Sequence, residues 1–393
     1  MTDSRDVSGN VSGKTAQPQP PLSIVLAGGG TAGHVSPLLA IAAALRQAAP
    51  DARLLAVGTA EGLEARLVPE AGLELALIER VPMPRRFNRA ALSFPARMRR
   101  ARKQARGILT DAQADVVVGV GGYVCTPMYA AASRSSIPVV IHEANMKPGL
   151  ANRLGARAAR YIGTAFADTA RAWGKRDAQW VGMPMRADIA RLAELEPAQR
   201  QRAREEARGR LGLQQDLPVL VVTGGSLGAA RINRAVADVA QAGDFASAGV
   251  QVLHLTGTGK AVTGPEGESL AAPGYHQQEY LSDMADAYVA ADLLICRAGA
   301  GTVSEVATAG VPAVFVPLPI GNGEQRLNAQ ILSDRGGAVL IKDKDFSAAW
   351  IRQEVLPLLA DPARLSEIGR IAAESGISDA AERMAELTLE AAR

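Results

Sequence analysis

Short apolar runs alternate with alanine-rich segments along the whole chain, and this alternation leaves few folds open to it. In order, the runs are SIVLA, RLLAV, LELALI, DVVVGV, PVVIH, YIGTA and QWVG, followed by PVLVVT, VQVLHLT, DLLIC, PAVFVP and GAVLI. Their hydrophobicity is continuous rather than alternating, which is typical of strands buried on both faces. Helical segments at 37–48, 228–241, 302–309 and 324–335 lie between runs. The pattern predicts an α/β fold in which helices cover parallel sheets.

The chain is long enough for two domains that each bury a core, since it has 393 residues. The series of runs breaks near VGMPMRAD, at 181–188. We therefore expect two Rossmann-like, doubly wound domains, the first at 23–185 and the second from 186 onward. Residues 1–22 are rich in Ser, Gly, Gln and Pro and lack the apolar segment of a signal peptide. They are predicted to form a disordered tail.

Glycine-rich turns follow three of the predicted strands. AGGGTAGHVSP, at 27–37, has the G-x-G-x-x-G spacing of dinucleotide-binding proteins, and GGSLGAARIN and RAGAGTVSEVATAG follow strands of the second half. Backbone N–H groups at such turns, with the positive end of the next helix, favour an anion. Ligands of such sheets bind beyond the carboxyl ends of the strands. The three turns predict a phosphorylated ligand between two facing domains.

A redox dinucleotide is disfavoured as that ligand. A dinucleotide-binding domain needs an acidic residue near the end of its second strand to bind a ribose. Here that strand, RLLAV, runs into Gly58 and Thr59, and Glu61 comes only at the start of a helix. The first turn also contains His34, a titratable side chain for which dinucleotide binding has no use. We therefore expect no bound cofactor and a reaction in which a histidine takes part.

Composition and charge restrict the setting. Apolar residues make up 48% and charged residues 21% of the chain, as in ordinary soluble proteins, and no run of about 20 apolar residues could span a membrane. Cys125 and Cys296 stand far apart in apolar contexts and are expected to be buried free thiols in a reducing cytosol. The net charge of +3 is uneven: residues 1–185 carry 23 Lys and Arg against 13 Asp and Glu (+10), and 186–393 carry 20 against 27 (−7).

The segment 80–106 accounts for most of that basic excess. It holds ten Lys or Arg and no Asp or Glu, interleaved with Met83, Phe87, Leu92, Phe94 and Met98. A solvated charged helix is the plain alternative, and a nucleic-acid surface is disfavoured because no nucleic-acid-binding motif accompanies it. Basic and apolar side chains together suit an anionic membrane surface. We expect membrane docking and no nucleic-acid partner.

An ordered set of motifs carries a resemblance to a known family. The motifs are GGGTAGHVSP, GVGGYVCTP, HEANMKPGLANR, VGMPMR, GGSLGAARIN, CRAGAGTVSEVATAGVPAVFVPLP and GNGEQRLNAQ. From about residue 23 to beyond 340 the chain closely resembles the UDP-N-acetylglucosamine:undecaprenyl-pyrophosphoryl-muramoyl-pentapeptide N-acetylglucosaminyltransferases, which make lipid II from lipid I in peptidoglycan synthesis. The resemblance implies a GT-B architecture, with a lipid-acceptor domain at 23–185 and a nucleotide-sugar domain at 186–365. It also implies final helices, at 366–393, that cross back to the first domain.

The resemblance implies inverting transfer of N-acetylglucosamine from UDP-N-acetylglucosamine to the 4-hydroxyl of lipid I, at the cytoplasmic face of the cell membrane. Cell-wall synthesis and division proteins are further expected partners. Another GT-B enzyme acting on UDP-sugars, such as a glycolipid glycosyltransferase or a UDP-N-acetylglucosamine 2-epimerase, is the nearest alternative. A nicotinamide-dependent dehydrogenase and a non-catalytic nucleotide sensor are more distant ones.

The acceptor hydroxyl needs a base, and the departing UDP needs charge stabilisation. His34 can accept the hydroxyl proton, and Glu143 in HEAN is the competing candidate. Backbone amides of Thr31, Ala32 and Gly33 can face a diphosphate in place of a metal. No metal is expected, because the D-x-D at 343–345 is interrupted by a lysine and lies beyond a late strand.

The remaining site residues follow from the resemblance. Glu305 would accept hydrogen bonds from the ribose hydroxyls, and Leu281 matches a position whose backbone reads uracil. The other residues that the resemblance assigns to the donor, its sugar or the acceptor side are Ala300, Gly301, Thr302, Val303, Ser304, Arg186, Ser226, Gln325, Asn328, Asn145 and Tyr123.

Overall fold

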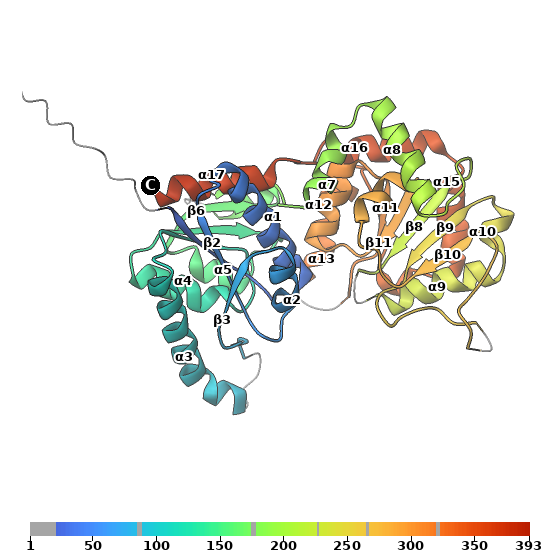
Figure 1. Cartoon of the computed structure of the whole chain (residues 1–393). Coiled ribbons are helices and arrows are strands. Elements are labelled where there is room, and N and C mark those ends of the chain that lie inside the picture. Colours follow the sequence, from blue (N-terminus) through green and yellow to red (C-terminus); the bar gives the residue numbers. More distant parts are fainter. Residues whose placement is uncertain (1–20, 85–88, 174–177, 226–227, 265–266, 320–322) are drawn as a thin grey trace, which may run out of the picture.

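The protein folds into two domains, each built on one parallel sheet (Figure 1). The computed structural model describes residues 21–84, 89–173, 178–225, 228–264, 267–319 and 323–393. The first sheet has seven strands in the order β3-β2-β1-β4-β5-β6-β7, and the second has six in the order β10-β9-β8-β11-β12-β13. Every pairing between these strands is parallel. The predicted α/β architecture with two doubly wound domains is confirmed.

The strands of the first domain are β1 (Ser23–Ala27), β2 (Arg53–Gly58), β3 (Glu74–Leu77), β4 (Val116–Gly119), β5 (Val139–Glu143), β6 (Ala159–Thr164) and β7 (Ala178–Trp180). Its helices are α1 (Ala32–Ala48), α2 (Glu64–Glu70), α3 (Arg89–Asp111), α4 (Cys125–Arg134), α5 (Leu150–Gly155) and α6 (Ala167–Ala172).

The strands of the second domain are β8 (Val219–Thr223), β9 (Gln251–Leu255), β10 (Tyr275–Gln278), β11 (Leu293–Cys296), β12 (Ala313–Phe315) and β13 (Val339–Leu340). Its helices are α7 (Ala187–Ala190), η1 (Arg191–Glu194), α8 (Pro197–Arg210), α9 (Ala230–Gln241), α10 (Asp244–Ser247), α11 (Met284–Ala290), α12 (Ala300–Ala309), α13 (Glu324–Ser333), η2 (Asp343–Asp345), α14 (Ala348–Trp350), η3 (Ile351–Val355), α15 (Leu356–Leu359) and α16 (Pro362–Ala373). The last helix of the chain is α17 (Ala380–Ala392).

The central strands are apolar throughout because helices cover both faces of each sheet. In β1, Ile24 and Leu26 contribute to the core on one face, and Val25 and Ala27 contribute to the core on the other. All four are fully buried. This arrangement explains why the sequence shows continuous hydrophobicity instead of a period of two.

Strand β10 was not predicted from the sequence. Its residues, Tyr275–Gln278, read YHQQ and carry none of the aliphatic run that marked the other strands. It pairs with β9 only and therefore forms an edge of the second sheet, where His276 is exposed. An edge strand needs no apolar side chains on both faces, so its sequence can be polar.

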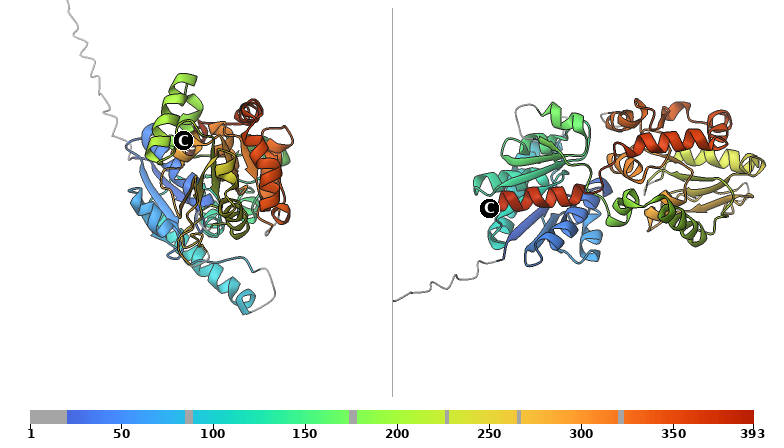
Figure 2. Two further views of the ribbon diagram at one scale, coloured as in Figure 1. Left: turned by 90° about the vertical axis from the view of Figure 1, so that its right-hand side faces the viewer. Right: turned by 90° about the horizontal axis from the view of Figure 1, so that it is seen from above.

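The C-terminal crossing begins later than expected. Helix α17 lies on α1 of the first domain, and its Met384 and Leu387 belong to that domain's core (Figure 2). Helix α16, by contrast, stays with the second domain, where it packs on α12. The Asp361 side chain accepts a hydrogen bond from Arg364 N (2.9 Å) and fixes the start of α16. The chain therefore crosses between Ala373 and Ala380, and the expected boundary at residue 366 lies too early.

Helix α3 extends away from the body of the first domain (Figure 1). Ala101, Ala105 and Leu109 form its buried face against α4. The side chains of its exposed basic face are those of Arg99, Arg102, Lys103 and Arg106. Residues 85–88 of the basic segment, Phe87 among them, lie outside the described residues. In the described part of the chain, no helix combines the length and the apolar character needed to cross a bilayer.

Candidate active site

The first glycine-rich loop places His34 in the first turn of α1. Thr31 is the N-cap of this helix, and its Oγ1 lies 3.1 Å from His34 Nδ1. The His34 ring is half-buried, and this burial lowers its pKa, although a backbone hydrogen bond at Gly29 and the charge of Glu64 act in the opposite direction. Thr31, Ala32 and Gly33 are exposed at the helix start. The loop therefore presents a neutral imidazole beside free backbone amides at neutral pH.

Glu64, at the start of α2, stabilises this loop through hydrogen bonds. Its Oε2 accepts a hydrogen bond from Gly30 N (2.7 Å), and its Oε1 accepts hydrogen bonds from Thr59 N and Thr59 Oγ1 (both 2.9 Å). The side chain is fully buried. A dinucleotide-binding domain would use an acid at the end of β2 to bind a ribose. Glu64 reaches this position, but its carboxylate oxygens already accept hydrogen bonds from Gly30 and Thr59, so the dinucleotide hypothesis fails. No motif of the sequence identifies Glu64, and the nearby glycines are the only signal for it.

A second glycine pair lies against the first loop. Gly121 and Gly122 follow β4 with φ values of +103° and +90°. A Cβ on Gly122 would lie 2.6 Å from the Gly29 carbonyl oxygen, and one on Gly121 would lie 3.0 Å from His34 Nε2. Only glycine allows the two loops to approach this closely. Tyr123 follows them, 40% exposed, with the Arg80 guanidinium 5.5 Å above its ring.

Glu143 ends β5 in a buried hydrogen-bond network. Its Oε1 accepts from Asn145 N (2.9 Å), and its Oε2 accepts from Gly149 N and Asn152 Nδ2 (both 2.9 Å). Asn152 also accepts a hydrogen bond from the Tyr129 hydroxyl (2.9 Å). Burial raises the pKa of Glu143, and these donors oppose that effect. The carboxylate is 2% exposed and both oxygens are occupied, so its contacts are those of a residue that holds the 143–149 loop.

The two domains meet at two of the predicted residues. Asn328 Oδ1, on α13, accepts a hydrogen bond from Met146 N (3.1 Å), and Asn328 Nδ2 lies 3.5 Å from Asn145 Oδ1. Asn328 is fully buried. The loop after β5 and the middle of α13 are thus joined by a direct interdomain contact.

Gln325 organises the loops of the second domain. Its Oε1 accepts hydrogen bonds from Leu318 N (2.9 Å) and Ala298 N (3.3 Å). These donors belong to the loops after β12 and β11, respectively. One side-chain oxygen thus ties together two strand ends next to the domain contact.

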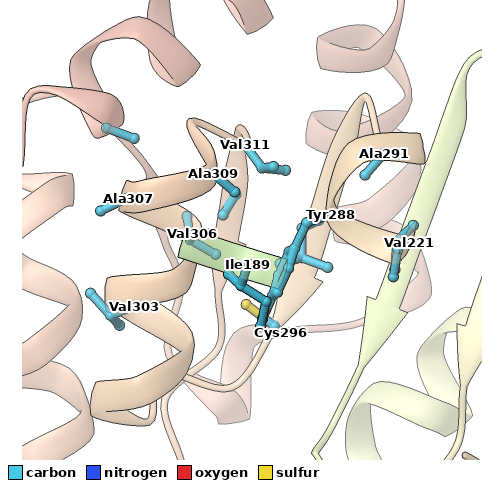
Figure 3. Close-up of a cluster of buried hydrophobic side chains, with 14 of the residues drawn as sticks. Ile189, Val221, Tyr288, Ala291, Cys296, Val303, Val306, Ala307, Ala309 and Val311 are labelled. Atoms are coloured by element: carbon cyan, nitrogen blue, oxygen red, sulfur yellow. The ribbon is translucent and has the colours of Figure 1, made fainter. Parts of the chain in front are cut away.

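The start of α12 offers backbone N–H groups to a ligand. Gly299 is its N-cap, and Val303 N already donates to Gly299 O (2.9 Å). The amides free of intrahelical partners are therefore those up to Thr302. Val303 is 1% exposed and packs in the core under the helix (Figure 3). Of the predicted stretch 300–304, the backbone amides of the first three residues have no intrahelical partner, whereas that of Val303 is used within the helix.

Glu305, one turn further along α12, is an ionisable group in an apolar setting. The Tyr288 hydroxyl donates to its Oε2 at 2.6 Å. Burial raises the pKa of Glu305, whereas the Tyr288 hydrogen bond and the charge of Arg186 lower it. Tyr288 itself is anchored in the apolar cluster that contains Cys296 (Figure 3). The carboxylate is therefore held in one position.

Arg186 brings another predicted group to this region. Its Nη1 donates to Ser282 O at 2.7 Å, and its guanidinium forms an ion pair with Asp188. Leu281, half-buried, directly precedes Ser282. The structure thus collects Arg186, Leu281 and Glu305 from three separate parts of the sequence.

Ser226 lies outside the described residues. Its neighbours define the turn after β8: Gly225 has φ +81°, and Gly228, with φ +68°, approaches the Thr256 carbonyl so closely that a Cβ would overlap it. The turn therefore has the glycine-dependent backbone expected of a phosphate-binding loop.

The D-x-D segment has a structural explanation. Asp343 forms ion pairs with Arg297 (2.6 Å) and Arg231 (3.0 Å). Within the described ranges, no group of three or more His, Cys, Asp or Glu side chains could hold a metal ion. Cys125 and Cys296 are buried free thiols, as predicted, and burial raises the pKa of Cys125 to about 11.

A cavity of about 530 Å³ lies between the domains near their connecting segments. Its lining is mixed, with apolar side chains from Phe166, Trp180, Met183, Ile331 and Ile377 beside polar and charged ones. Its lining includes Met146 and, on α12, Val303 and Ser304, but neither His34 nor Glu305, so the cavity adjoins the candidate active site on the side of α12.

Two parallel-sheet domains with glycine-rich turns at their strand ends are the architecture of a two-domain glycosyltransferase. The chain belongs to glycosyltransferase family 28: residues 24–164 match the family's N-terminal domain and residues 219–384 its C-terminal domain.

The more specific similarity is to one transferase. The chain is 57% identical to the UDP-N-acetylglucosamine–N-acetylmuramyl-(pentapeptide) pyrophosphoryl-undecaprenol N-acetylglucosamine transferase of Paenarthrobacter aurescens over 96% of this chain and 98% of that protein. It is 48% identical to the enzyme of that name in Mycolicibacterium smegmatis, over 95% of this chain and 94% of that protein. The crystal structure of Acinetobacter baumannii MurG superposes with a TM-score of 0.73 and 30% identity, over 94% of this chain and all of that one.

A likeness to a nearby enzyme class extends to the fold alone. The UDP-GlcNAc 2-epimerase of Neisseria meningitidis superposes over 94% of this chain and all of that one with a TM-score of 0.63, at 12% identity.

Proposed function

We propose that this protein transfers N-acetylglucosamine from UDP-N-acetylglucosamine to the 4-hydroxyl of the N-acetylmuramoyl unit of lipid I, giving lipid II. The observation that carries the proposal is the 57% identity, over nearly the full length of both chains, to a transferase named for this reaction. The relation to the 2-epimerase, at 12% identity, supports no shared activity.

His34 is the proposed general base. Burial lowers its pKa, so the imidazole is neutral at physiological pH and can accept the proton of the acceptor hydroxyl. Such a base contributes roughly 10²–10⁴-fold to the rate. Glu143, the competing candidate, has both oxygens occupied by hydrogen bonds. We assign to Glu143 the positioning of the loop that carries Asn145.

The departing UDP is proposed to be stabilised by backbone dipoles and Arg186 rather than by a metal. The free amides at the start of α12 and the turn that contains Ser226 supply the dipoles. Arg186 already lies beside the 281–283 segment, and diphosphate oxygens would compete with Asp188 for its guanidinium. Because Asp343 forms ion pairs with two arginines, we assign the D-x-D segment a structural role and not a metal-binding one.

Donor recognition is proposed for the second domain. Glu305 would accept hydrogen bonds from the ribose hydroxyls, and the backbone at Leu281 would contact uracil. Gln325 and Asn328 would contact the sugar, with Asn145 completing that side of the cleft. Tyr123, exposed beside the first glycine loop, would face the acceptor.

The setting is proposed to be the cytoplasmic face of the cell membrane, where the enzyme binds peripherally through residues 80–106. The exposed Arg99, Arg102, Lys103 and Arg106 support this, because basic side chains near an anionic surface contribute about 1 kcal/mol each. Leu92, on the same helix, is 73% exposed and would insert among the lipids. Cell-wall synthesis and division proteins remain proposed partners.

The test offers the enzyme UDP-N-acetylglucosamine and a short-chain lipid I analogue and measures UDP release and the disaccharide product. Acceptor-dependent UDP release is expected, and its absence would contradict the proposed function. His34→Ala should lower kcat on the order of 10²-fold or more. His276→Ala, at an exposed position on β10, is the matched control and should leave kcat unchanged. Equal rates for the two variants would remove His34 as the base.

A further inference from the structure

Glu64 is a fully buried carboxylate with no part in the proposed chemistry so far. Three glycines make room for it: a Cβ on Gly29, Gly58 or Gly62 would overlap its side chain. Gly29 belongs to the His34 loop, and the other two flank the turn after β2. An acid that faced solvent at the start of a helix would need no glycines around it. The three glycines are therefore required by the burial of Glu64.

The charge of this carboxylate is satisfied by donors from both loops. Burial alone would raise the pKa of Glu64, and the hydrogen bonds from Gly30 and Thr59, with its own backbone N–H, outweigh burial and lower the pKa. Glu64 is therefore ionised at neutral pH. Its hydrogen bond from Gly30 N, at 2.7 Å, is the shortest of the three it accepts from other residues.

One peptide group connects Glu64 to His34. The N–H of the Gly29–Gly30 peptide donates to Glu64 Oε2 (2.7 Å), and the Gly29 backbone and the charge of Glu64 both raise the pKa of His34. A carboxylate on the N–H side polarises a peptide group and makes its carbonyl a stronger acceptor. Glu64 thus acts on His34 as a carboxylate that orients a histidine does, except that a peptide group lies between the two side chains.

We propose that Glu64 is a positioning residue of the transfer reaction: through the Gly29–Gly30 peptide it fixes the glycine loop and orients the imidazole of His34. This inference rests on the proposed function for its reaction. Its geometry rests on the Gly30–Glu64 hydrogen bond, the glycines that enclose Glu64, and Thr31 Oγ1 beside His34 Nδ1. The same contact turns Gly30 N away from the ligand and leaves the amides of 32 and 33 to face it.

Other titratable groups around His34 are few. On the side of the β4–α4 loop, Cys125 hydrogen-bonds the backbone of Gly121 and is a neutral thiol. On the side of α5, Asn152 separates the ring from Glu143. Glu64 is the charge that acts on the imidazole, and it favours the protonated ring.

The test measures the titration of His34 by NMR without substrates, and separately the pH profile of kcat/KM. Glu64→Gln should lower the pKa of His34, move the acid limb of the profile to lower pH, and reduce the plateau kcat roughly tenfold. The KM for UDP-N-acetylglucosamine should stay unchanged. Glu64→Asp keeps the charge but is shorter, so its acid limb should stay near that of the wild type while its plateau kcat falls.

Two further variants keep the test decisive. Asp115→Asn removes a carboxylate that accepts Ser23 N (2.7 Å) near the opposite end of β1, and it should change stability without moving the His34 titration. Gly62→Ala pushes the Glu64 carboxylate aside from outside the loop and should reproduce the lower plateau if Glu64→Gln fails to fold. An unchanged His34 titration and plateau in the Glu64 variants, with the wild type active, would overturn the proposal. A wild type without acceptor-dependent activity would instead overturn the proposed function.

Discussion

Two half-buried titratable side chains of the candidate site, His34 and Glu305, have pKa values that burial shifts in opposite directions. Burial lowers the pKa of His34, which favours the neutral ring needed by a base, and raises the pKa of Glu305, which disfavours the ionised form needed to accept ribose hydrogen bonds. In Glu305 the Tyr288 hydroxyl and the charge of Arg186 restore part of the ionised population. Donor binding should therefore be more sensitive to acid than the sequence alone suggests.

Tyr288→Phe tests this balance. The change removes the 2.6 Å hydrogen bond that stabilises ionised Glu305, so the pKa of Glu305 rises further and more of it is protonated at a given pH. The KM for UDP-N-acetylglucosamine should rise roughly fivefold at mildly acidic pH, the effect of about 1 kcal/mol, and by less at basic pH. KM measured across pH checks this. Tyr275→Phe, which loses a buried hydrogen bond to His254 (2.7 Å), is the control, and an equal rise in that variant would contradict the prediction.

At single residues, the sequence predicted groups that belong to ordered motifs and missed those defined only by contact. His34 stands in a glycine-rich loop after a strand, where the chemistry of its side chain is conspicuous. Glu64 sits in GLEARLV, which reads as the start of an ordinary helix. Its burial depends on Gly29 and Gly58, which come from other elements, so no local pattern identifies it. At Val303 the motif shows the start of a helix but does not show that the Val303 amide already donates to Gly299 O within that helix.

Helix α3 shows how one element can carry two surfaces. Ala101 and Ala105 fix one face on α4, and the basic side chains occupy the other. Near the base of the helix, Arg97 and Arg100 form ion pairs with Glu79 (2.7 and 3.0 Å). The basic segment is therefore not uniform, and two of its charges hold the helix to the strand end.

The membrane proposal makes a specific prediction for α3. Replacing Arg99, Arg102 and Arg106 by Gln should weaken binding to anionic vesicles roughly a hundredfold at low salt, from about 1 kcal/mol per charge. Activity on a short-chain, water-soluble acceptor should be unchanged. Vesicle co-sedimentation measures the first and UDP release the second.

The matched control removes exposed charges from the second domain, with Arg202, Arg234 and Lys344 replaced by Gln. An equal loss of vesicle binding in both triple variants would mean that overall charge, and not α3, binds the surface.

At the level of elements the sequence predicted every buried strand because burial leaves an aliphatic run. It missed β10 because an edge strand leaves none.

At the scale of the whole molecule, the last helix belongs to the first domain. Gly182, with φ +88°, lies against Ile377 where the two connecting segments pass each other, and a Cβ there would lie 2.7 Å from Ile377 Cβ. The two domains thus share a double connection. The sequence predicted two domains from the interrupted series of strands, but the exact crossing point depends on which core α16 joins, and that is a tertiary property.

Met384→Ala should destabilise the first domain although it lies near the C-terminus. Met384 is fully buried in the core that contains β1 and α1, and truncating such a side chain costs about 2–5 kcal/mol. Hydrogen exchange should show increased opening in residues 23–165. Leu365→Ala, on α16, is the counterpart and should loosen the second domain instead. Destabilisation of the same domain by both variants would contradict the assignment.

The position of α17 also governs the order in which the domains are completed during synthesis. The ribosome makes residues 23–165 first, yet the helix that covers the apolar face of α1 consists of residues 380–392, near the end of the chain. The second domain is a continuous stretch that ends with α16, so it lacks no segment once α16 has emerged. The domain that is translated first is therefore the last to close its core, and a chain that terminates early leaves that face of α1 exposed.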